Sequence, residues 1–249
     1  MPKVAIIAAL HREVRALVKT WARIQREHQG RKFTFFEKDE FVVVCGGVGV
    51  ESARRAAEAV IALYQPAVVY SVGFAGALDS ALRVGDVFAP SVVIDARDGS
   101  RTQLDFGDGT LLTFMAVAAP DQKEKLAQAY GARAVDMEAA AVAAATQAHG
   151  IGFGVTKVIS DELDFEMPEM ARFITMDGQF KSASFIRYAA VRPWLWKRVG
   201  ILARNSNHAA RVLAQQLDGL SIDPSKSEAS TRPAAPMAAV NGLPAEGRK

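Results

Sequence analysis

The chain has 249 residues, of which 50% are hydrophobic and 23% are charged, a composition typical of globular proteins. A formal net charge of +3 gives no reason to expect a nucleic-acid partner, and no apolar run of about 18 residues predicts a transmembrane helix. With one cysteine, Cys45, and four scattered His residues, neither a disulfide framework nor a metal site is expected. The first ten residues lack the layout of a signal peptide. These features predict a cytoplasmic protein without a metal.

Apolar residues along the chain alternate between short continuous runs and helical spacing. We expect strands over residues 3–10, 32–37, 40–47, 66–78, 85–95, 110–120, 133–137 and 152–160. We expect helices over residues 11–24, 50–64, 121–131, 138–149 and 180–217, the last interrupted at Pro193. Lys38-Asp39, between two β-rich runs, predicts a hairpin.

Strands that alternate with helices indicate a largely parallel sheet, which the early hairpin makes mixed. We therefore predict an α/β fold, a three-layer single domain with a central mixed β-sheet flanked by helices. This domain spans residues 1–220. Residues 221–249 are rich in Pro, Ser, Ala and Gly and poor in large apolar side chains, so we expect a disordered tail.

Two glycine-containing segments follow predicted strands. Residues 46–52 (GGVGVES) precede a helix, where backbone N–H groups can bind an anion or a ribose, although a tight turn without a ligand explains the glycines equally well. Their spacing matches neither the dinucleotide fingerprint nor the phosphate loop, so NAD and ATP are not expected. Residues 71–78 (SVGFAGAL) end a central strand, at the edge where open α/β sheets bind ligands, and a tight turn is again the alternative.

Acidic residues also stand at the ends of predicted strands. In VDME (135–138) a carboxylate could bind a sugar diol, but taken alone the pair is better explained as a helix cap, Asp136, and an acid in the first helical turn, Glu138. Asp161 follows a long apolar strand and suits a general acid in a desolvated pocket, with a helix cap as the alternative. Glu13, in a first helical turn, is by itself most simply an acid that favours the helix dipole.

The order of these signals is more specific than any one of them. An acid after the first strand, G-x-G before a helix, a glycine turn after a central strand, V-x-M-E and then I-S-D resemble the purine nucleoside phosphorylase and methylthioadenosine nucleosidase superfamily over residues 3–164. Within it, VDMEAAAVA and the segment RPWLWKR…ARNS (192–206) are most similar to the hopanoid-associated phosphorylases.

The resemblance implies an enzyme that cleaves a purine N-glycosidic bond, without an organic cofactor and with inorganic phosphate as an optional co-substrate. The resemblance implies two catalytic residues: Asp161, which protonates the leaving base, and Glu13, which positions or activates the attacking water. It implies that Glu138 holds the ribose hydroxyls. It further implies supporting contacts from Met137, Ser160, Gly73, Ala75 and Gly76. It also implies a small-molecule nucleoside as the partner and a homo-oligomer as the assembly.

Several positions depart from the family pattern. Ala8-Ala9 replaces a glycine-bearing phosphate loop, Phe74 stands where a serine is common, and FMAVAAP (114–120) takes the place of the G-D-A-F stretch that cradles adenine. The basic residues nearest to a phosphate, Arg12 and Arg15, follow no family pattern. Water and phosphate therefore stay open as nucleophiles. So does the substrate: adenosylhopane is favoured, a methylthioadenosine/S-adenosylhomocysteine nucleosidase is the alternative, and a catalytically silent nucleoside-binding protein is the third.

The segment 181–211 combines basic residues with Trp194 and Trp196 and contains no acid. Such a segment can lie at a lipid headgroup boundary, although an ordinary closing helix with a solvated basic face is favoured. If the substrate carries a lipid tail, this segment is the candidate for a peripheral contact between the protein and the inner membrane surface.

Overall fold

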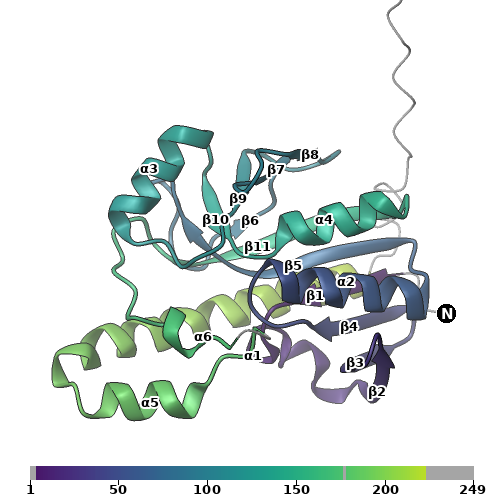
Figure 1. Ribbon diagram of the computed structural model, residues 1–249, viewed down its shortest axis with the longest axis horizontal. Coiled ribbons are helices and arrows are strands. Elements are labelled where there is room, and N and C mark those ends of the chain that lie inside the picture. Colours follow the sequence, from purple (N-terminus) through teal and green to yellow (C-terminus); the bar gives the residue numbers. More distant parts are fainter. Residues whose placement is uncertain (1–3, 176–177, 223–249) are drawn as a thin grey trace, which may run out of the picture.

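The computed structural model describes residues 4–175 and 178–222, which form one α/β domain (Figure 1). The strands are β1 Val4–Ala8, β2 Ala22–His28, β3 Arg31–Lys38, β4 Phe41–Cys45, β5 Val68–Ala77, β6 Val87–Phe88, β7 Val92–Asp95, β8 Arg101–Gln103, β9 Thr110–Thr113, β10 Ala134–Asp136 and β11 Gly152–Asp161. The α-helices are α1 His11–Val14, α2 Val50–Tyr64, α3 Pro120–Tyr130, α4 Ala139–Ala148, α5 Ser182–Ala190 and α6 Pro193–Ile222, with short 3-10 helices at Leu17–Thr20 and Ala171–Phe173.

All the described strands belong to one mixed sheet, in the order β2-β3-β4-β1-β5-β10-β9-β7-β8. The long strand β5 organises it, because it pairs in parallel with β1 and β11 and antiparallel with β10. β11 also pairs with β6, off the main path. The carboxyl ends of β1, β5 and β11 therefore lie at the same edge of the sheet, where ligands of open α/β sheets bind.

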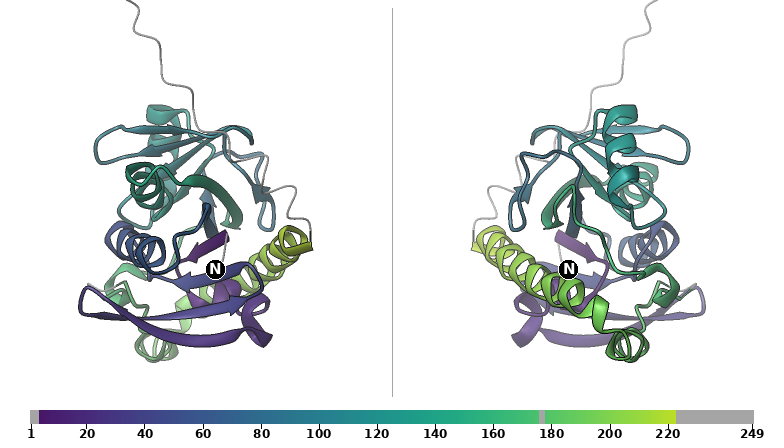
Figure 2. Two further views of the ribbon diagram at one scale, coloured as in Figure 1. Left: turned by 90° about the vertical axis from the view of Figure 1, so that its right-hand side faces the viewer. Right: turned by 90° about the vertical axis from the view of Figure 1, so that its left-hand side faces the viewer.

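Helices cover both faces of this sheet, which confirms the predicted three-layer architecture. Alanine-rich faces of α2 and α4 pack on one face, against residues such as Ala5, Val42 and Val44. On the other face, α6 packs Leu213 and Leu217 against β1, β5 and β11. Figure 2 shows the blue α2 and the yellow-green α6 on opposite sides of the sheet.

Local sequence explains where several helices begin and end. α2 starts after Gly49, which has a φ of 95°, and ends at Gln65 in the left-handed conformation. α3 starts with Pro120 at its first position and ends at Gly131, also left-handed. Leu126 of α3 packs on Leu112 and Val135, so this helix covers the β9–β10 side of the sheet.

Four expected features differ in the structure. The helix expected over 11–24 stops at Val14 and, after a 3-10 turn, becomes β2, whose mostly exposed residues pair with β3 at the sheet edge. The strand expected over 110–120 ends at Thr113, and the one over 85–95 splits into β6 and β7. The glycines at 71–78 lie inside β5 rather than in a turn after it. The hairpin at Lys38-Asp39 and the break of the last helical segment before Pro193 are as predicted.

The expected domain boundary at residue 220 falls within α6, which runs to Ile222. The predicted disordered tail, 221–249, lies outside the described residues from 223 onward. Within the part of the chain that the structure describes, no helix is long and apolar enough to cross a membrane.

Candidate active site

One pocket lies where the carboxyl ends of β1, β5, β10 and β11 meet. Seven of the eight residues predicted for the site line it: Glu13, Ala75, Gly76, Met137, Glu138, Ser160 and Asp161. The eighth, Gly73, is directly behind Glu13, since a Cβ built on it would lie 3.0 Å from Glu13 Oε2. Segments more than 140 residues apart in sequence thus bring the predicted side chains together around one space.

Asp161 is held on both oxygens by its neighbours. The pairing of β11 with β5 shifts register between Ile159 and Asp161, and this bulge turns the strand end toward the pocket. The Ser160 hydroxyl donates to Asp161 Oδ1 at 2.7 Å, and the Lys123 ammonium donates to Oδ2 at 2.5 Å. Lys123 also donates to the carbonyl of Glu162 at 2.6 Å. The Lys123 and Asp161 side chains are 1% and 5% exposed, so this is a buried ion pair.

Glu138 is bound by the glycine turn at 46–52. The Gly49 N–H donates to Glu138 Oε1 at 2.9 Å, and the Met137 N–H donates to Oε2 at 3.2 Å. The anion that this turn binds is therefore a carboxylate of the protein itself. Burial, together with the neighbouring Asp136, raises the pKa of Glu138 to about 7.

Asp136 binds the start of α4 and pairs with a second buried lysine. Its Oδ2 accepts the N–H of Ala139, the first residue of α4, at 2.8 Å, although the N-cap position is Glu138 and not the predicted Asp136, and it lies 2.9 Å from Lys157 Nζ. The Thr113 hydroxyl donates to Oδ1 at 2.6 Å. Burial by itself lowers the pKa of Lys157, but the carboxyl groups of Asp136 and Glu138 outweigh it and raise that pKa. Lys157 is thus held as a cation under the floor of the pocket.

Glu13 lies in the short helix α1, just after the end of β1. Its Oε2 accepts the N–H groups of Ala9 and Leu10 at 3.0 and 3.1 Å. Burial raises the pKa of Glu13, while the Leu10 hydrogen bond and the Lys157 charge act in the opposite direction. A carboxylate with a raised pKa accepts a proton more readily near neutral pH, which suits a general base.

The glycines of β5 leave room for these carboxyl groups. Gly73 has a φ of 138°, a conformation that residues with a side chain rarely adopt. At Gly76 an added Cβ would come within 2.8 Å of Asp161 Oδ2. Both positions therefore need glycine because an acid approaches the backbone closely.

The remaining wall of the pocket is apolar. It consists of Leu10, Val48, Ile174, Phe180, Met167, Met170 and the 116–118 segment that follows β9. Met167, Met170 and Ile174 belong to the connection between β11 and α5. Among the described residues, no group of three His, Cys, Asp or Glu side chains is placed to hold a metal ion.

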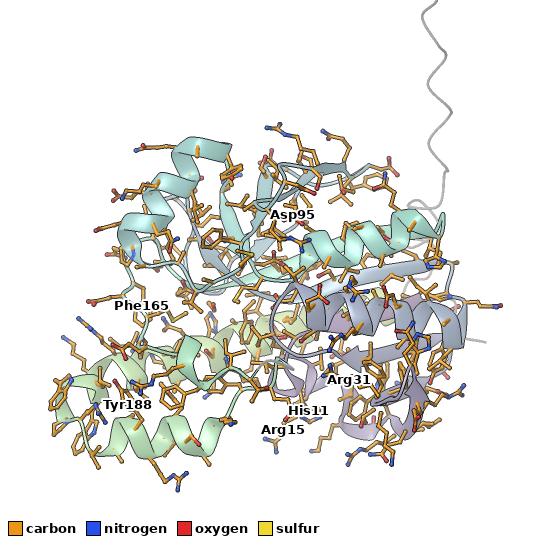
Figure 3. All side chains as sticks on the ribbon, viewed as in Figure 1. His11, Arg15, Arg31, Asp95, Phe165 and Tyr188 are labelled. Atoms are coloured by element: carbon orange, nitrogen blue, oxygen red, sulfur yellow. The ribbon has the colours of Figure 1, made fainter. Side chains whose placement is uncertain are left out.

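Sequence reasoning did not find the two lysines of the site. Lys123 lies in an unremarkable charged helix, so nothing local indicated its contact with Asp161. Lys157 did leave a signal, because it is a lone cation inside the buried strand GFGVTKVIS. Of the two arginines considered for phosphate, Arg12 lines the pocket and its guanidinium lies 5.8 Å from the centre of the Phe74 ring. Arg15 lines a separate hollow with Lys19 and Arg211, and Figure 3 shows it beside His11.

Residues 3–124 and 109–185 match the family model described as the Phosphorylase superfamily, which is well over half of the chain. The chain belongs to this superfamily. Over 203 residues it is 27% identical to the 5'-methylthioadenosine/S-adenosylhomocysteine nucleosidase of Actinobacillus succinogenes, covering 66% of this chain and 87% of that protein. The protein of the same name from Halalkalibacterium halodurans is 31% identical over 125 residues, which are 49% of this chain and 53% of that protein.

Solved structures share the fold at lower identity. Futalosine hydrolase of Helicobacter pylori superposes with a TM-score of 0.64 at 19% identity, covering 88% of this chain and 98% of that one. The H. pylori 5'-methylthioadenosine/S-adenosylhomocysteine nucleosidase superposes with a TM-score of 0.63 at 18% sequence identity. The match covers 88% of this chain and 99% of that one. The predicted fold class is therefore confirmed. The superfamily match and the named relatives also confirm the prediction of an enzyme that cleaves N-glycosyl bonds.

Proposed function

We propose that this enzyme releases adenine from a purine nucleoside whose 5′ carbon carries a large apolar group, with adenosylhopane as the candidate substrate. The observation that carries the proposal is that Asp161 and Glu138 line one pocket whose remaining wall is mainly apolar. A merely nucleoside-binding protein, the third alternative, would gain weight if these two acids faced different spaces, and they do not.

Asp161 is the proposed acid. Cleavage breaks the bond between C1′ and the purine nitrogen, and the bonding electrons go to the base. A proton on a ring nitrogen of the base neutralises this charge, which is worth about 10²–10⁴-fold in rate. Ser160 and Lys123 fix the orientation of the Asp161 carboxyl group by binding one oxygen each. Because Lys123 and Asp161 form an ion pair, the proton that Asp161 delivers to the base comes from the Lys123 ammonium, which is left as a neutral amine.

Glu138 is the proposed ribose ligand. Its oxygens are fixed by Gly49 and Met137, so the carboxylate is held without side-chain freedom before the substrate arrives. A carboxylate that accepts hydrogen bonds from the diol also lies close to the positive charge that develops on the sugar ring, and this attraction is strong in a desolvated pocket. Met137, next to it on the pocket wall, is proposed to pack against the sugar.

The nucleophile is water or phosphate. Glu13 favours water, because its carboxylate can accept the proton that water loses as its oxygen bonds to C1′. Arg12 favours phosphate, because its guanidinium lies in the pocket wall where it can neutralise an anion. Neither path requires an organic cofactor or a metal, and we propose none.

The apolar wall favours the lipid-tailed substrate. Met167, Met170, Ile174 and Phe180 come from the segment between β11 and the α5–α6 hairpin, and we propose that the bulky 5′ group packs against these side chains. The second candidate, methylthioadenosine or S-adenosylhomocysteine, is favoured by the names of the curated relatives. By the superfamily resemblance we further propose a homo-oligomer, which light scattering would test.

The decisive assay measures adenine release from adenosine, methylthioadenosine and adenosylhopane, each with and without phosphate. We expect the highest kcat/KM with adenosylhopane, and ribose 1-phosphate-type products only if phosphate is the nucleophile. Asp161→Asn should lower kcat far more than it raises KM, whereas the matched control Asp121→Asn, an exposed acid on α3, should leave both unchanged. No adenine release from any substrate, or normal turnover by Asp161→Asn, would refute the proposal.

A further inference from the structure

Four large apolar side chains are exposed around the turn between α5 and α6. Ile186 is 63% exposed, Val191 71%, Trp194 71% and Trp196 59%. We call these four residues the tip surface. The hairpin that carries them projects from one end of the molecule, at the lower left of Figure 1. Tryptophan is normally largely buried, so two exposed indoles at one turn indicate a surface that meets something apolar.

The residues of the tip surface do not take part in the internal packing of the α5–α6 hairpin. The Phe185 ring of α5 contacts the rings of Phe173 and Phe180, with centroids 5.4 and 5.6 Å away, and the Tyr188 ring lies 5.3 Å from that of Phe173. Figure 3 shows Tyr188 between the two helices. On α6 the buried position is Leu195, with Trp194 and Trp196 on either side of it. The exposure of the two indoles is therefore set by the register of a packed hairpin.

Trp196 is held in place as well as exposed. Its indole N–H donates to the carbonyl of Ala189, at the end of α5, at 3.1 Å. The polar edge of the ring is thus satisfied by the protein and the rest of the ring faces outward. An indole with its N–H satisfied at the protein and an outward apolar edge suits insertion among acyl chains near the headgroups.

The charged side chains of the hairpin segment itself are all basic. Residues 178–217 contain seven Lys or Arg residues and no Asp or Glu. Arg187 and Lys197 are the exposed basic residues that directly adjoin members of the tip surface in sequence. A partner that complements this surface must be both apolar and negatively charged, which describes an anionic lipid bilayer better than another copy of the same basic surface.

We propose that the tip surface docks on an anionic membrane, with Trp194 and Trp196 in the headgroup region and Arg187 and Lys197 on the phosphate groups. The docked hairpin is continuous with the wall of the pocket. Phe180, which lines the pocket, packs on Phe185 of α5, and Arg198 of α6 forms an ion pair with Glu166 beside Met167. On this point the inference rests on the proposed function: the docked hairpin brings the apolar side of the pocket to the bilayer that holds a lipid-tailed substrate.

Co-sedimentation with vesicles tests the docking directly. The full chain should bind vesicles of phosphatidylglycerol and phosphatidylcholine, bind phosphatidylcholine vesicles far less, and lose binding as salt is raised. The double variant Trp194→Ser/Trp196→Ser should lower the partition coefficient at least roughly tenfold. Arg187→Gln/Lys197→Gln should lower it by roughly fivefold per residue at low salt. A matched double variant at exposed apolar residues elsewhere, Phe106→Ser/Met115→Ser, should bind like the parent.

Tryptophan fluorescence gives a second readout. Of the three tryptophans, Trp21 is 9% exposed, so a blue shift on adding vesicles reports on Trp194 and Trp196. Equal binding by the parent and the Trp194→Ser/Trp196→Ser variant, or no binding to anionic vesicles at all, would overturn the proposal. A fall in oligomer mass in this variant, without any vesicle binding by the parent, would instead assign the tip surface to a contact between copies.

Activity assays separate a failed docking from a failed function. With a soluble nucleoside in the absence of vesicles, the tip variants should keep the kcat/KM of the parent, because none of these residues lines the pocket. With a lipid-tailed nucleoside embedded in anionic vesicles, they should lose activity in proportion to their loss of binding. Parent enzyme that binds vesicles but releases no adenine supports docking and refutes the proposed function. Variants that stay fully active on the embedded substrate would refute docking alone.

Discussion

Replacing Lys123 by methionine tests the most unusual interaction of the pocket. Methionine keeps most of the unbranched side chain and removes only the charge, so Asp161 would stay buried without its cation. Removing one partner of a buried ion pair costs about 3–5 kcal/mol. The Lys123 and Asp161 side chains are 1% and 5% exposed, so the ion pair is buried and a cost within this range applies. We also expect a fall in kcat, since only Ser160 would then orient the acid.

A double-mutant cycle isolates the pair from other effects of the substitution. Urea unfolding would be measured for the parent, Lys123→Met, Asp161→Asn and the double variant. Once Asp161 is neutral, Lys123→Met should cost far less, giving a coupling free energy on the order of 3 kcal/mol. Lys125→Met, on the exposed face of the same helix, is the matched control and should change stability by less than about 0.5 kcal/mol. A coupling below about 0.5 kcal/mol, with normal kcat in Lys123→Met, would refute the argument.

Three further substitutions test other parts of the structure. Burial and Asp136 raise the pKa of Glu138 to about 7, above its ordinary 4.5, so the folded protein holds an extra proton between these values and its free energy of unfolding should fall as pH rises through that window. Glu138→Gln should remove this dependence of stability on pH. In the parent enzyme, KM should fall as Glu138 ionises. A KM that does not change with pH would contradict the role of Glu138 as ribose ligand. Gly73→Ala places a Cβ 3.0 Å from Glu13 Oε2 at a φ of 138°, so kcat should fall at least tenfold in steady-state assays while circular dichroism shows a retained fold. Leu213→Ala removes a fully buried side chain between α6 and the sheet and should cost about 2–5 kcal/mol in urea unfolding, against less than about 0.5 kcal/mol for exposed Gln215→Ala.

Burial made the central part of the fold predictable. The strands β1, β4, β5 and β11 are continuous apolar runs because helices cover both of their faces, and such runs stand out in a sequence. β2 has the opposite character: it lies at the sheet edge, pairs only with β3 and exposes most of its residues. Its residues therefore carry no apolar alternation, and the helical spacing of Val14, Leu17 and Val18 just before it extended the expected helix too far.

The candidate site was predictable in its acids but not in its cations. Carboxylates at the ends of strands are visible in sequence because strand ends are marked by where the apolar run stops, as at Asp161. The partner of such an acid is set by tertiary packing: Lys123 reaches Asp161 only because α3 packs on the β9–β10 side of the sheet. The glycine turn at 46–52 shows the same limit, since its ligand, Glu138, lies 89 residues further along the chain.

The balance of charge around the pocket connects stability with the proposed chemistry. Glu13, Asp136, Glu138 and Asp161 supply four carboxyl groups, whereas Lys123 and Lys157 supply two ammonium groups. Burial raises the pKa values of Glu13 and Glu138, and the neighbouring Asp136 adds to the rise at Glu138, so carrying negative charge on these groups is unfavourable. A neutral nucleoside does not supply a compensating positive charge, but the sugar ring does as the glycosidic bond breaks. The excess of carboxyl groups therefore binds the transition state more strongly than the substrate, which is the condition for a higher kcat. The same argument explains why Glu138→Gln should stabilise the folded protein above pH 7 and yet weaken catalysis.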